Sequence, residues 1–356
     1  TITGDVLGQC GATFNPSTTP FVTTWTVQQD DLDIEIYTIN SFDYDFTVDW
    51  GDGQTEQNLN GDVTHTYANA GTYTVSITGV FPYFKTCRIS AGLTFFGVDC
   101  DNSTKLSSVE SWGNQEWRVM DGSFNSAENF NSNTLQAPDL SFVTSLIYTF
   151  KDAESFNQNI DGWDVSNVTD MISLFENATS FNQPLNSWNV SNVKSMERMF
   201  TDASSFNQPL SDWDVSNVTN MLWMFDNAVS FNQDISDWCV EQIPNEPFRF
   251  ANNSPIQASF LPDWGATCTF SIAENSLNNF KVYPNPVEDQ LNLFWSSLNF
   301  PGEMNIQVYN LSGKKVFDQS YSQKPSELDV SQLSSGIYLL KVISGDQSAI
   351  RKIVKK

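Results

Sequence analysis

The sequence predicts a multidomain chain in which a β-sandwich is followed by an α/β solenoid with 25-residue coils and then by a second β-sandwich. Three observations support this prediction. Apolar and polar residues alternate with a period of two before residue 84, which is typical of strands. A repeat with a step of 25 residues fills the middle of the chain, and strand-turn-strand patterns return after residue 280. The expected boundaries are a linker over 1–20, a sandwich over 21–84, a solenoid over 85–270 with regular repeats at 124–250, a linker over 271–279 and a terminal domain over 280–356.

The charge of the chain is strongly negative and unevenly distributed. The 17 Lys/Arg and 42 Asp/Glu residues give a formal net charge of -25. Residues 1–276 hold 8 Lys/Arg and 35 Asp/Glu, a balance of -27, whereas the rest holds 9 and 7, a balance of +2. This excludes a nucleic-acid partner and opposes binding to an anionic membrane surface. The sequence has no apolar run long enough for a transmembrane helix, and its start at Thr1 suggests a removed leader and a secreted or outer-surface protein.

The five cysteines show no CxxC spacing, so neither a zinc nor a redox motif is indicated. Cys239 lies in the last recognisable repeat and Cys268 just beyond it, so a disulfide there would pin the end of the solenoid. Cys87 and Cys100 could close a loop between the domains, which leaves Cys10 over. The alternative, five reduced thiols, is less expected in an oxidising compartment.

The N-terminal domain has alternating segments at residues 34–38 and 73–78, which predict strands of a sandwich. Its turns resemble those of a polycystic-kidney-disease (PKD) type domain. The resemblance implies an immunoglobulin-like β-sandwich that serves as a spacer or binding module. The motifs that carry it are Trp50-Gly51-Asp52-Gly53, His65-Thr66-Tyr67 and Gly71-Thr72-Tyr73-Thr74-Val75.

The repeat keeps its large apolar residues at fixed positions, and each unit is too small to bury its own apolar face, so the units must stack. Met221, Met224, Phe225 and Ala228 stand at i, i+3, i+4 and i+7, which predicts a short helix. Alternation over residues 206–210 predicts a short strand. One strand and one helix per coil is the plan of a leucine-rich repeat. The Phe-Asn-Gln motif starts at Phe156, Phe181, Phe206 and Phe231, and the equivalent tryptophans are Trp163, Trp188, Trp213 and Trp238.

The wording of the unit, Met-x-x-Met-Phe-x-x-Ala-x-Ser-Phe-Asn-Gln-x-Leu-x-x-Trp-x-Val-Ser-Asn-Val, resembles the BspA-like leucine-rich-repeat surface proteins of bacteria over residues 124–240. The resemblance implies a cell-surface or secreted binding protein. The asparagines of the motif are expected to form a ladder whose amides satisfy the backbone of neighbouring coils. They are Asn157, Asn182, Asn207 and Asn232.

The C-terminal domain resembles the type A sorting domain of the type IX secretion system. This implies export across the outer membrane of a Bacteroidetes-type bacterium and contact with the type IX secretion machinery. In this family the domain is usually cleaved, and the cargo is released or attached to the surface. The motifs that carry the resemblance are Tyr283-Pro284-Asn285-Pro286, Asn310-Leu311-Ser312-Gly313-Lys314, Ser335-Gly336-Ile337-Tyr338 and the basic end at 352–356.

No catalytic constellation stands out. His65 is the only histidine, and it belongs to the His-Thr-Tyr motif, so we expect a protein that is not an enzyme. Asp49 and Asp52 flank Gly51 and are weak candidates for calcium ligands. The favoured alternative is a glycine turn in which the aspartates accept hydrogen bonds from their own backbone. No other cofactor is predicted.

The best ligand candidates are large or charged residues that differ from coil to coil, above all Lys194, Arg198 and Trp223. They predict a non-enzymatic adhesion protein whose solenoid recognises a protein, extracellular-matrix or glycan partner. The alternative is a carbohydrate-binding module, or an accessory protein in polysaccharide use, which would need a solvent-facing strip of the repeat tryptophans. Two further alternatives are a hydrolase with two facing carboxylates in a cleft between the first two domains, and a purely structural spacer.

Overall fold

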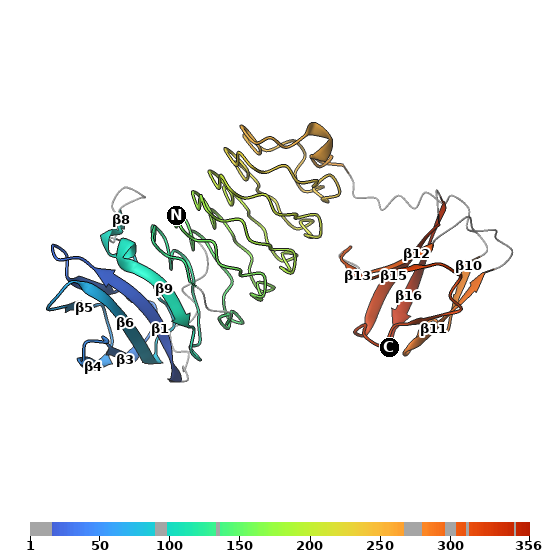
Figure 1. Cartoon of the computed structure of the whole chain (residues 1–356). Coiled ribbons are helices and arrows are strands. Elements are labelled where there is room, and N and C mark those ends of the chain that lie inside the picture. Colours follow the sequence, from blue (N-terminus) through green and yellow to red (C-terminus); the bar gives the residue numbers. More distant parts are fainter. Residues whose placement is uncertain are drawn as a thin grey trace. The chain divides into compact units, whose positions relative to one another are not determined.

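The computed structural model describes residues 16–89, 98–132, 136–266, 280–295, 304–310, 313–344 and 347–356. The chain divides into two compact units, residues 1–265 and residues 266–356 (Figure 1). Among the described residues, the regular elements are strands and two short 3-10 helices, and there is no α-helix. The predicted α/β leucine-rich-repeat fold is therefore wrong, because the protein is all-β.

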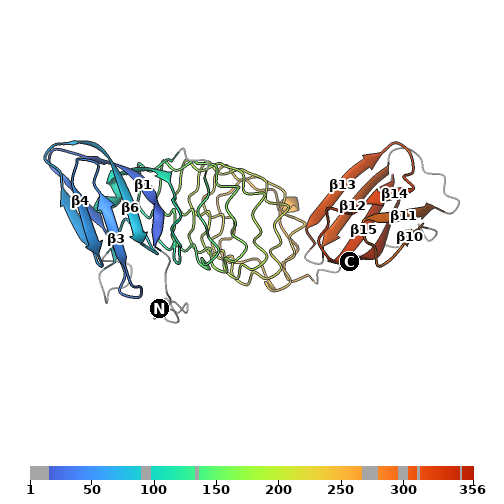
Figure 2. The same ribbon diagram turned by 90° about the horizontal axis from the view of Figure 1, so that it is seen from below.

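The first unit begins with antiparallel sheets (Figure 2). The main sheet has five strands in the order β4-β3-β6-β1-β9. β1 begins inside the segment expected as a linker, and β9 lies in the segment expected to belong to the solenoid, before its regular repeats. The bounds are β1 Ser17–Val27, β3 Asp45–Asp49, β4 Thr55–Leu59, β6 Gly71–Val80 and β9 Leu106–Ser111; β2 Asp33–Ile36 pairs with β5 Val63–Thr66, β7 Arg88–Ile89 pairs with β8 Val98–Asp99, and η2 is Asp101–Lys105.

The sheets and the repeats share one hydrophobic core. Alternate residues of β1 are buried, among them Phe21 and Trp25, as the period-two pattern requires. The ring of Phe21 lies 5.1 Å from that of Phe84, and Phe84 lies 5.8 Å from Phe124 in the first coil, between ring centroids. Because aromatic rings bridge the junction continuously, the sheet caps the apolar end of the repeat stack.

Hydrogen bonds between successive coils define the repeats. The N–H groups of Met196, Arg198 and Phe200 donate to carbonyls of the next coil at 2.9 Å each. The N–H groups between them close tight turns within the coil, as from Met199 to the Met196 carbonyl at 3.2 Å. Parallel bridges link the same position of four coils, at Ser145, Asp170, Ser195 and Asn220.

The helix predicted over 221–228 is absent, although its apolar spacing was read correctly. Met221, Met224, Phe225 and Ala228 all have buried side chains. However, every second N–H of this segment goes to the next coil, as from Phe225 to the Phe250 carbonyl at 2.7 Å, and so cannot close a helix. Left-handed residues at positions such as Trp223 (φ 56°) also interrupt the helical path. A series of short turns thus gives the same inward spacing.

The predicted asparagine ladder is confirmed, with its side chains exposed or half-buried rather than buried. The side-chain oxygens of the first four asparagines accept the backbone N–H of the equivalent residue in the next coil, at 3.0–3.1 Å, whereas the oxygen of the last, Asn232, has no hydrogen-bond partner among the described residues. This ladder stands where a short strand was predicted over 206–210, and no strand occurs there. The ladder runs through Asn131, Asn157, Asn182, Asn207 and Asn232.

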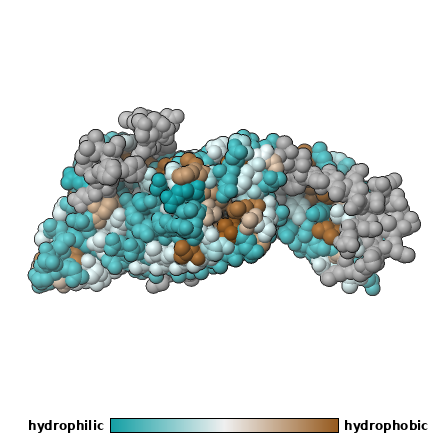
Figure 3. Space-filling view, turned by 90° about the horizontal axis from the view of Figure 1, so that it is seen from above, coloured by the Kyte–Doolittle hydropathy of each residue, from teal (hydrophilic) through white to brown (hydrophobic). Residues whose placement is uncertain are grey.

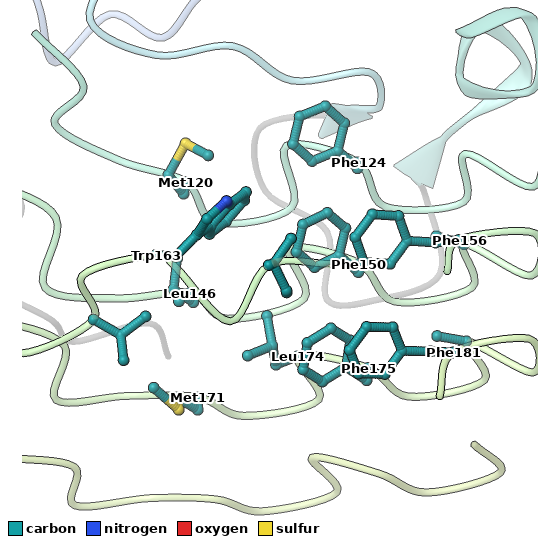
Figure 4. Packing of buried hydrophobic residues seen from close by; sticks show 14 of the residues in the cluster. Met120, Phe124, Leu146, Phe150, Phe156, Trp163, Met171, Leu174, Phe175 and Phe181 are labelled. Carbon is teal, nitrogen blue, oxygen red and sulfur yellow. The ribbon is translucent and has the colours of Figure 1, made fainter. Parts of the chain in front are cut away.

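Two columns of phenylalanine rings form the core of the repeats, and Figure 4 shows Phe150 beside Phe156 and Phe175 beside Phe181. Rings in one column are 5.4–6.0 Å apart between centroids and nearly parallel from coil to coil. The two columns touch within each coil at 4.0–4.5 Å. The first column is Phe124, Phe150, Phe175, Phe200 and Phe225, and the second is Phe130, Phe156, Phe181, Phe206 and Phe231.

Asn182→Ala should destabilise the repeats by about 1–3 kcal/mol, because it leaves a backbone donor without its partner. The Asn182 oxygen accepts the Asn207 N–H and the Gln208 side-chain amide, both at 3.0 Å. Urea denaturation of the full chain would measure the loss. Asn186→Ala, an exposed asparagine of the same coil, is the matched control and should change the free energy of unfolding by less than about 0.5 kcal/mol. Equal effects of the two changes would contradict the ladder's contribution to stability.

The end of the repeats is closed by a short cap. η3 spans Ala258–Phe260, and the Trp264 ring packs on Phe250 at 4.9 Å. Gly265 has a left-handed φ of 69°, and a Cβ on it would lie 2.8 Å from the Pro244 backbone, so only glycine fits there.

The second unit has two antiparallel sheets around a separate core that includes Val287, Ile306 and Leu340. This fits the β-sandwich predicted for the C-terminal domain. One sheet has the order β10-β11-β14, with β10 Phe280–Tyr283, β11 Gln290–Trp295 and β14 Glu327–Asp329. The other has the order β13-β12-β15-β16, with β12 Met304–Asn310, β13 Lys315–Tyr321, β15 Gly336–Ser344 and β16 Gln347–Lys355.

Candidate binding face on the repeats

Residues 25 positions apart lie side by side on neighbouring coils, because backbone hydrogen bonds between the coils fix their register. The N–H of Arg198, for example, donates to the Leu222 carbonyl, and that of Trp223 donates to the Phe248 carbonyl. One position of this register carries a different side chain in every coil, and that side chain is exposed or half-buried in every coil except the one with Ser173, which is fully buried. This variable column consists of Tyr148, Ser173, Arg198, Trp223 and Phe248.

The C-terminal half of the variable column is a chain of contacting large side chains. The Arg198 guanidinium lies 4.5 Å from the centroid of the Trp223 ring, which is a cation–π contact. Trp223 meets the edge of Phe248 at 5.7 Å, and Phe248 is 65% exposed. Glu197 lies 3.8 Å from the Arg198 Nε. Two of the predicted ligand residues, Arg198 and Trp223, are thus in direct contact.

Lys194, the third predicted ligand residue, is exposed four positions before Arg198. Its backbone N–H donates to the Thr169 carbonyl at 2.7 Å, and its carbonyl accepts the Thr219 N–H at 2.9 Å. These hydrogen bonds fix the backbone of Lys194 between the two neighbouring coils.

The electrostatic environment of the variable column is acidic. Burial, with Glu176 and Glu197 nearby, raises the pKa of Tyr148 to about 12. Burial and the Glu197 charge raise the pKa of Asp170 above its usual range. Lys151, one of the neighbouring cations, is paired with Glu176 at 2.8 Å. The face therefore favours a partner that brings positive charge.

Exposed apolar side chains on the repeats were missed at the sequence level. Phe248 and Val229 are 65% and 57% exposed, whereas the repeated aromatic residues are buried. In the face shown by Figure 3, apolar patches interrupt a mostly hydrophilic surface. Counting 25 residues on from Trp223 could have identified Phe248.

The repeat tryptophans belong to the core. Trp163, Trp188, Trp213 and Trp238 are only 3–5% exposed. The indole N–H groups of the last three donate to carbonyls of the preceding coil at 2.9–3.0 Å. They form no solvent-facing aromatic strip.

Asp49 and Asp52 are engaged in local turns. Asp49 accepts the Gly51 N–H, and Asp52 accepts the Gln54 N–H, at 3.0 Å each. The other Asp52 oxygen lies 3.0 Å from His65 Nε2. Partial burial acts to raise the pKa of Asp52, but the hydrogen bonds from Gln54 and His65 lower it below its usual value. Within the ranges that the structure describes, no group of three or more His, Cys, Asp or Glu side chains could hold a metal ion.

His65 is a structural residue of the sandwich. Its ring stacks on Trp50 with centroids 4.7 Å apart and meets the edge of Tyr67 at 4.6 Å. Asp52 lies on its Nε2, so Trp50, Tyr67 and Asp52 enclose the ring on three sides, and none of them is a Ser or Cys nucleophile.

A polar cleft of about 590 Å³ lies at the edge of the sandwich next to the start of the repeats, near where the hydrolase alternative placed a site. Its lining includes Asp30, Asp31, Lys105 and Asn129. Lys105 donates to the Asp31 carboxylate at 2.6 Å and to the Asp33 carbonyl at 2.8 Å. The two carboxylates are consecutive in the chain, and one is neutralised by an ion pair, so the cleft lacks two opposed acids across a substrate.

Of the predicted disulfides, one lies wholly in the described residues. Cys87 and Cys100 are bonded, with a Cα–Cα distance of 4.3 Å. Cys239 is also disulfide-bonded, but Cys268, its predicted partner, and Cys10 lie outside the described residues.

The C-terminal unit has the strand pattern and motif positions described above, and comparison of the chain with protein families decides its identity. Residues 281–356 match a secretion system C-terminal sorting domain. This region is a type IX secretion sorting domain. The sorting domain shows that the chain is exported to the cell surface or secreted, and that the type IX machinery is one of its partners. No described helix has the length and apolarity needed to cross a bilayer.

The repeats resemble a second family. Residues 94–203 and 159–264 match the family described as "Mycoplasma protein of unknown function, DUF285". No curated protein shows significant similarity to the chain. The sorting domain therefore defines where the protein goes, while the family of the repeats does not define what it binds.

Proposed function

We propose that the protein is a non-enzymatic adhesion protein that recognises a basic protein or extracellular-matrix partner through the variable column. The Arg198–Trp223–Phe248 contact chain is the observation that supports this proposal most directly. Arg and Trp are the side chains most often found as energetic hot spots of protein interfaces. The acidic surroundings favour basic side chains on the partner.

The N-terminal sheets then act as a spacer and cap, in keeping with the PKD-like turns, and the repeats act as the recognition element. BspA-like surface proteins supply the analogy for this division of roles. Enzymatic activity is not part of the proposal, because His65 is enclosed and the Asp31 carboxylate is paired with Lys105.

The glycan alternative has lost its principal support. It needed exposed repeat tryptophans, and Trp163, Trp188 and Trp213 are buried with closely packed neighbours. We therefore keep glycans as one arm of the binding test and not as a second proposal.

Trp223→Ala should weaken binding to the partner by about tenfold or more, because it removes the ring that both Arg198 and Phe248 contact. The full chain would be screened against arrays of matrix proteins, bacterial-surface proteins and glycans, with and without calcium, and each hit would be measured by surface plasmon resonance. Arg198→Ala should also weaken binding, and the affinity should fall as salt rises.

Val229→Ala is the matched control, because Val229 is exposed on the repeats but lies outside the variable column. Its affinity should equal that of the unchanged protein. A partner whose affinity is insensitive to Trp223 and Arg198 would show that recognition occurs elsewhere. Binding to glycans alone would contradict the proposed partner class.

A further inference from the structure

The final strand of the sorting domain is held by the segment that begins the same domain. β16 is the last strand in the order β13-β12-β15-β16, so only one of its edges pairs with a neighbouring strand of the sheet. Near its end, the other edge is covered by residues 285–287. Val287 forms a parallel bridge with Lys355, donates its N–H to the Val354 carbonyl at 2.7 Å and accepts the Lys356 N–H at 2.9 Å.

Asn285 extends this pairing with its side chain. Its amide NH₂ donates to the Lys352 carbonyl at 2.8 Å, and its amide oxygen accepts the Val354 N–H at 2.8 Å. A side-chain amide carries a donor and an acceptor side by side, so it can pair with an open strand edge as a peptide group does. Asn285 is exposed, so these two hydrogen bonds, rather than burial, fix its position.

We call the pairing of residues 285–287 with the edge of residues 352–356 the clamp. We propose that the type IX machinery binds the C-terminal strand while the clamp holds it, and that Asn285 is the residue that positions this strand. The clamp closes the edge over residues 352–356 and leaves the side chains of Lys352 and Lys356 exposed for a partner. An unpaired strand edge would instead be free to pair with other chains before export. Through the clamp, Asn285 of the Tyr-Pro-Asn-Pro motif would act in export by positioning the C-terminal strand.

The test compares variants of the full chain in a bacterium that has the type IX system. Asn285→Ala removes both hydrogen bonds, and each net hydrogen bond shifts the equilibrium about fivefold, so the exported fraction should fall about tenfold or more. Asn285→Asp can still accept the Val354 N–H but cannot donate to the Lys352 carbonyl, and it should fail similarly. Export is measured as the ratio of surface and medium protein to periplasmic protein.

Ile306→Val is the matched control, because it trims a fully buried side chain of β12 and destabilises the domain without touching the clamp. It should export normally even where its melting temperature falls as much as that of Asn285→Ala. Hydrogen exchange supplies the second readout, since the Val354 and Lys356 amides should lose protection in Asn285→Ala and keep it in Ile306→Val.

Three outcomes would overturn the proposal. One is export of Asn285→Ala at the normal level although the Val354 and Lys356 amides exchange faster. Another is unchanged exchange at these amides, which would show that Asn285 does not hold the strand. The third is a loss of export that follows melting temperature alone across all variants, which would reduce the role of Asn285 to general stability.

Discussion

Phe200→Ala is expected to lower the free energy of unfolding of the repeats by about 3–5 kcal/mol, the usual cost of truncating a buried phenylalanine. Phe200 is fully buried, and its ring lies 5.5 Å from Phe175, 5.5 Å from Phe225 and 4.1 Å from Phe206. The cavity would open in the middle of both ring columns, where neighbouring coils are held in register by backbone hydrogen bonds and cannot collapse to fill it. Denaturant unfolding followed by tryptophan fluorescence would measure the change.

Phe248→Ala is the control for this prediction. It removes the same ring from a position that is 65% exposed, so the free energy of unfolding should change by less than about 0.5 kcal/mol. The same variant should weaken partner binding, because Phe248 contacts Trp223. A large stability loss from Phe248→Ala, or a small one from Phe200→Ala, would contradict the assignment of core and face.

Asp121→Asn is expected to stabilise the protein by about 1–3 kcal/mol above pH 6 and to have little effect near pH 4. Burial raises the pKa of Asp121 to about 6, and the charge of Asp170 contributes, while hydrogen bonds from Ser145 and the Ile147 N–H act against the rise. The folded protein therefore binds this proton more tightly than the unfolded chain. The stabilisation that comes from protonated Asp121 is complete below the pKa of this residue in the unfolded chain. It is lost as the pH rises through about 6, the pKa in the folded protein.

Thermal unfolding between pH 4 and pH 8 would test this expectation. An asparagine at position 121 can still accept the Ile147 N–H, which lies 3.0 Å from the present carboxylate oxygen, so the geometry is retained. Asp164→Asn serves as the control, because hydrogen bonds from the side chain and backbone of Ser166 lower the pKa of Asp164. That substitution should destabilise at neutral pH. Equal pH dependence in the two variants would rule out burial of Asp121 as the cause.

The sequence could predict which residues are buried in the repeats but not the backbone that buries them. The step of 25 residues identified the phenylalanines, methionines and tryptophans that form the core. A spacing of i, i+3, i+4 and i+7 is compatible with a helix, yet it is also produced by successive turns that include left-handed residues. Asp202 (φ 57°) and Asn227 (φ 58°) adopt the left-handed conformation with little cost. Arg198 and Trp223 adopt it because their backbone hydrogen bonds to the next coil hold them there. Hydrogen bonds to the next coil decide between the two, and no local pattern reveals them.

Part of the candidate site could be predicted because the repeat fixes which residues stand at equivalent positions. Arg198 and Trp223 could be chosen because they depart from the repeat, and a common register placed them together. Phe248 was missed because the pattern of the units breaks down after residue 240, which hides its place in the column. The roles of Asn285 and Asp121 depend on contacts between residues far apart in the sequence, and these became visible only in the folded chain.

The register of the coils also determines how such a protein can change its length. The step from Phe124 to Phe150 is 26 residues rather than 25, yet the two rings still stack at 5.4 Å and 8°. One extra residue is therefore absorbed away from the ring columns. Duplication or loss of a whole unit would preserve every contact between coils, because each coil contacts only its neighbours. Duplication of one unit in the gene would thus lengthen the binding face by one side chain per column. Selection could then change the length of the binding surface without changing the fold.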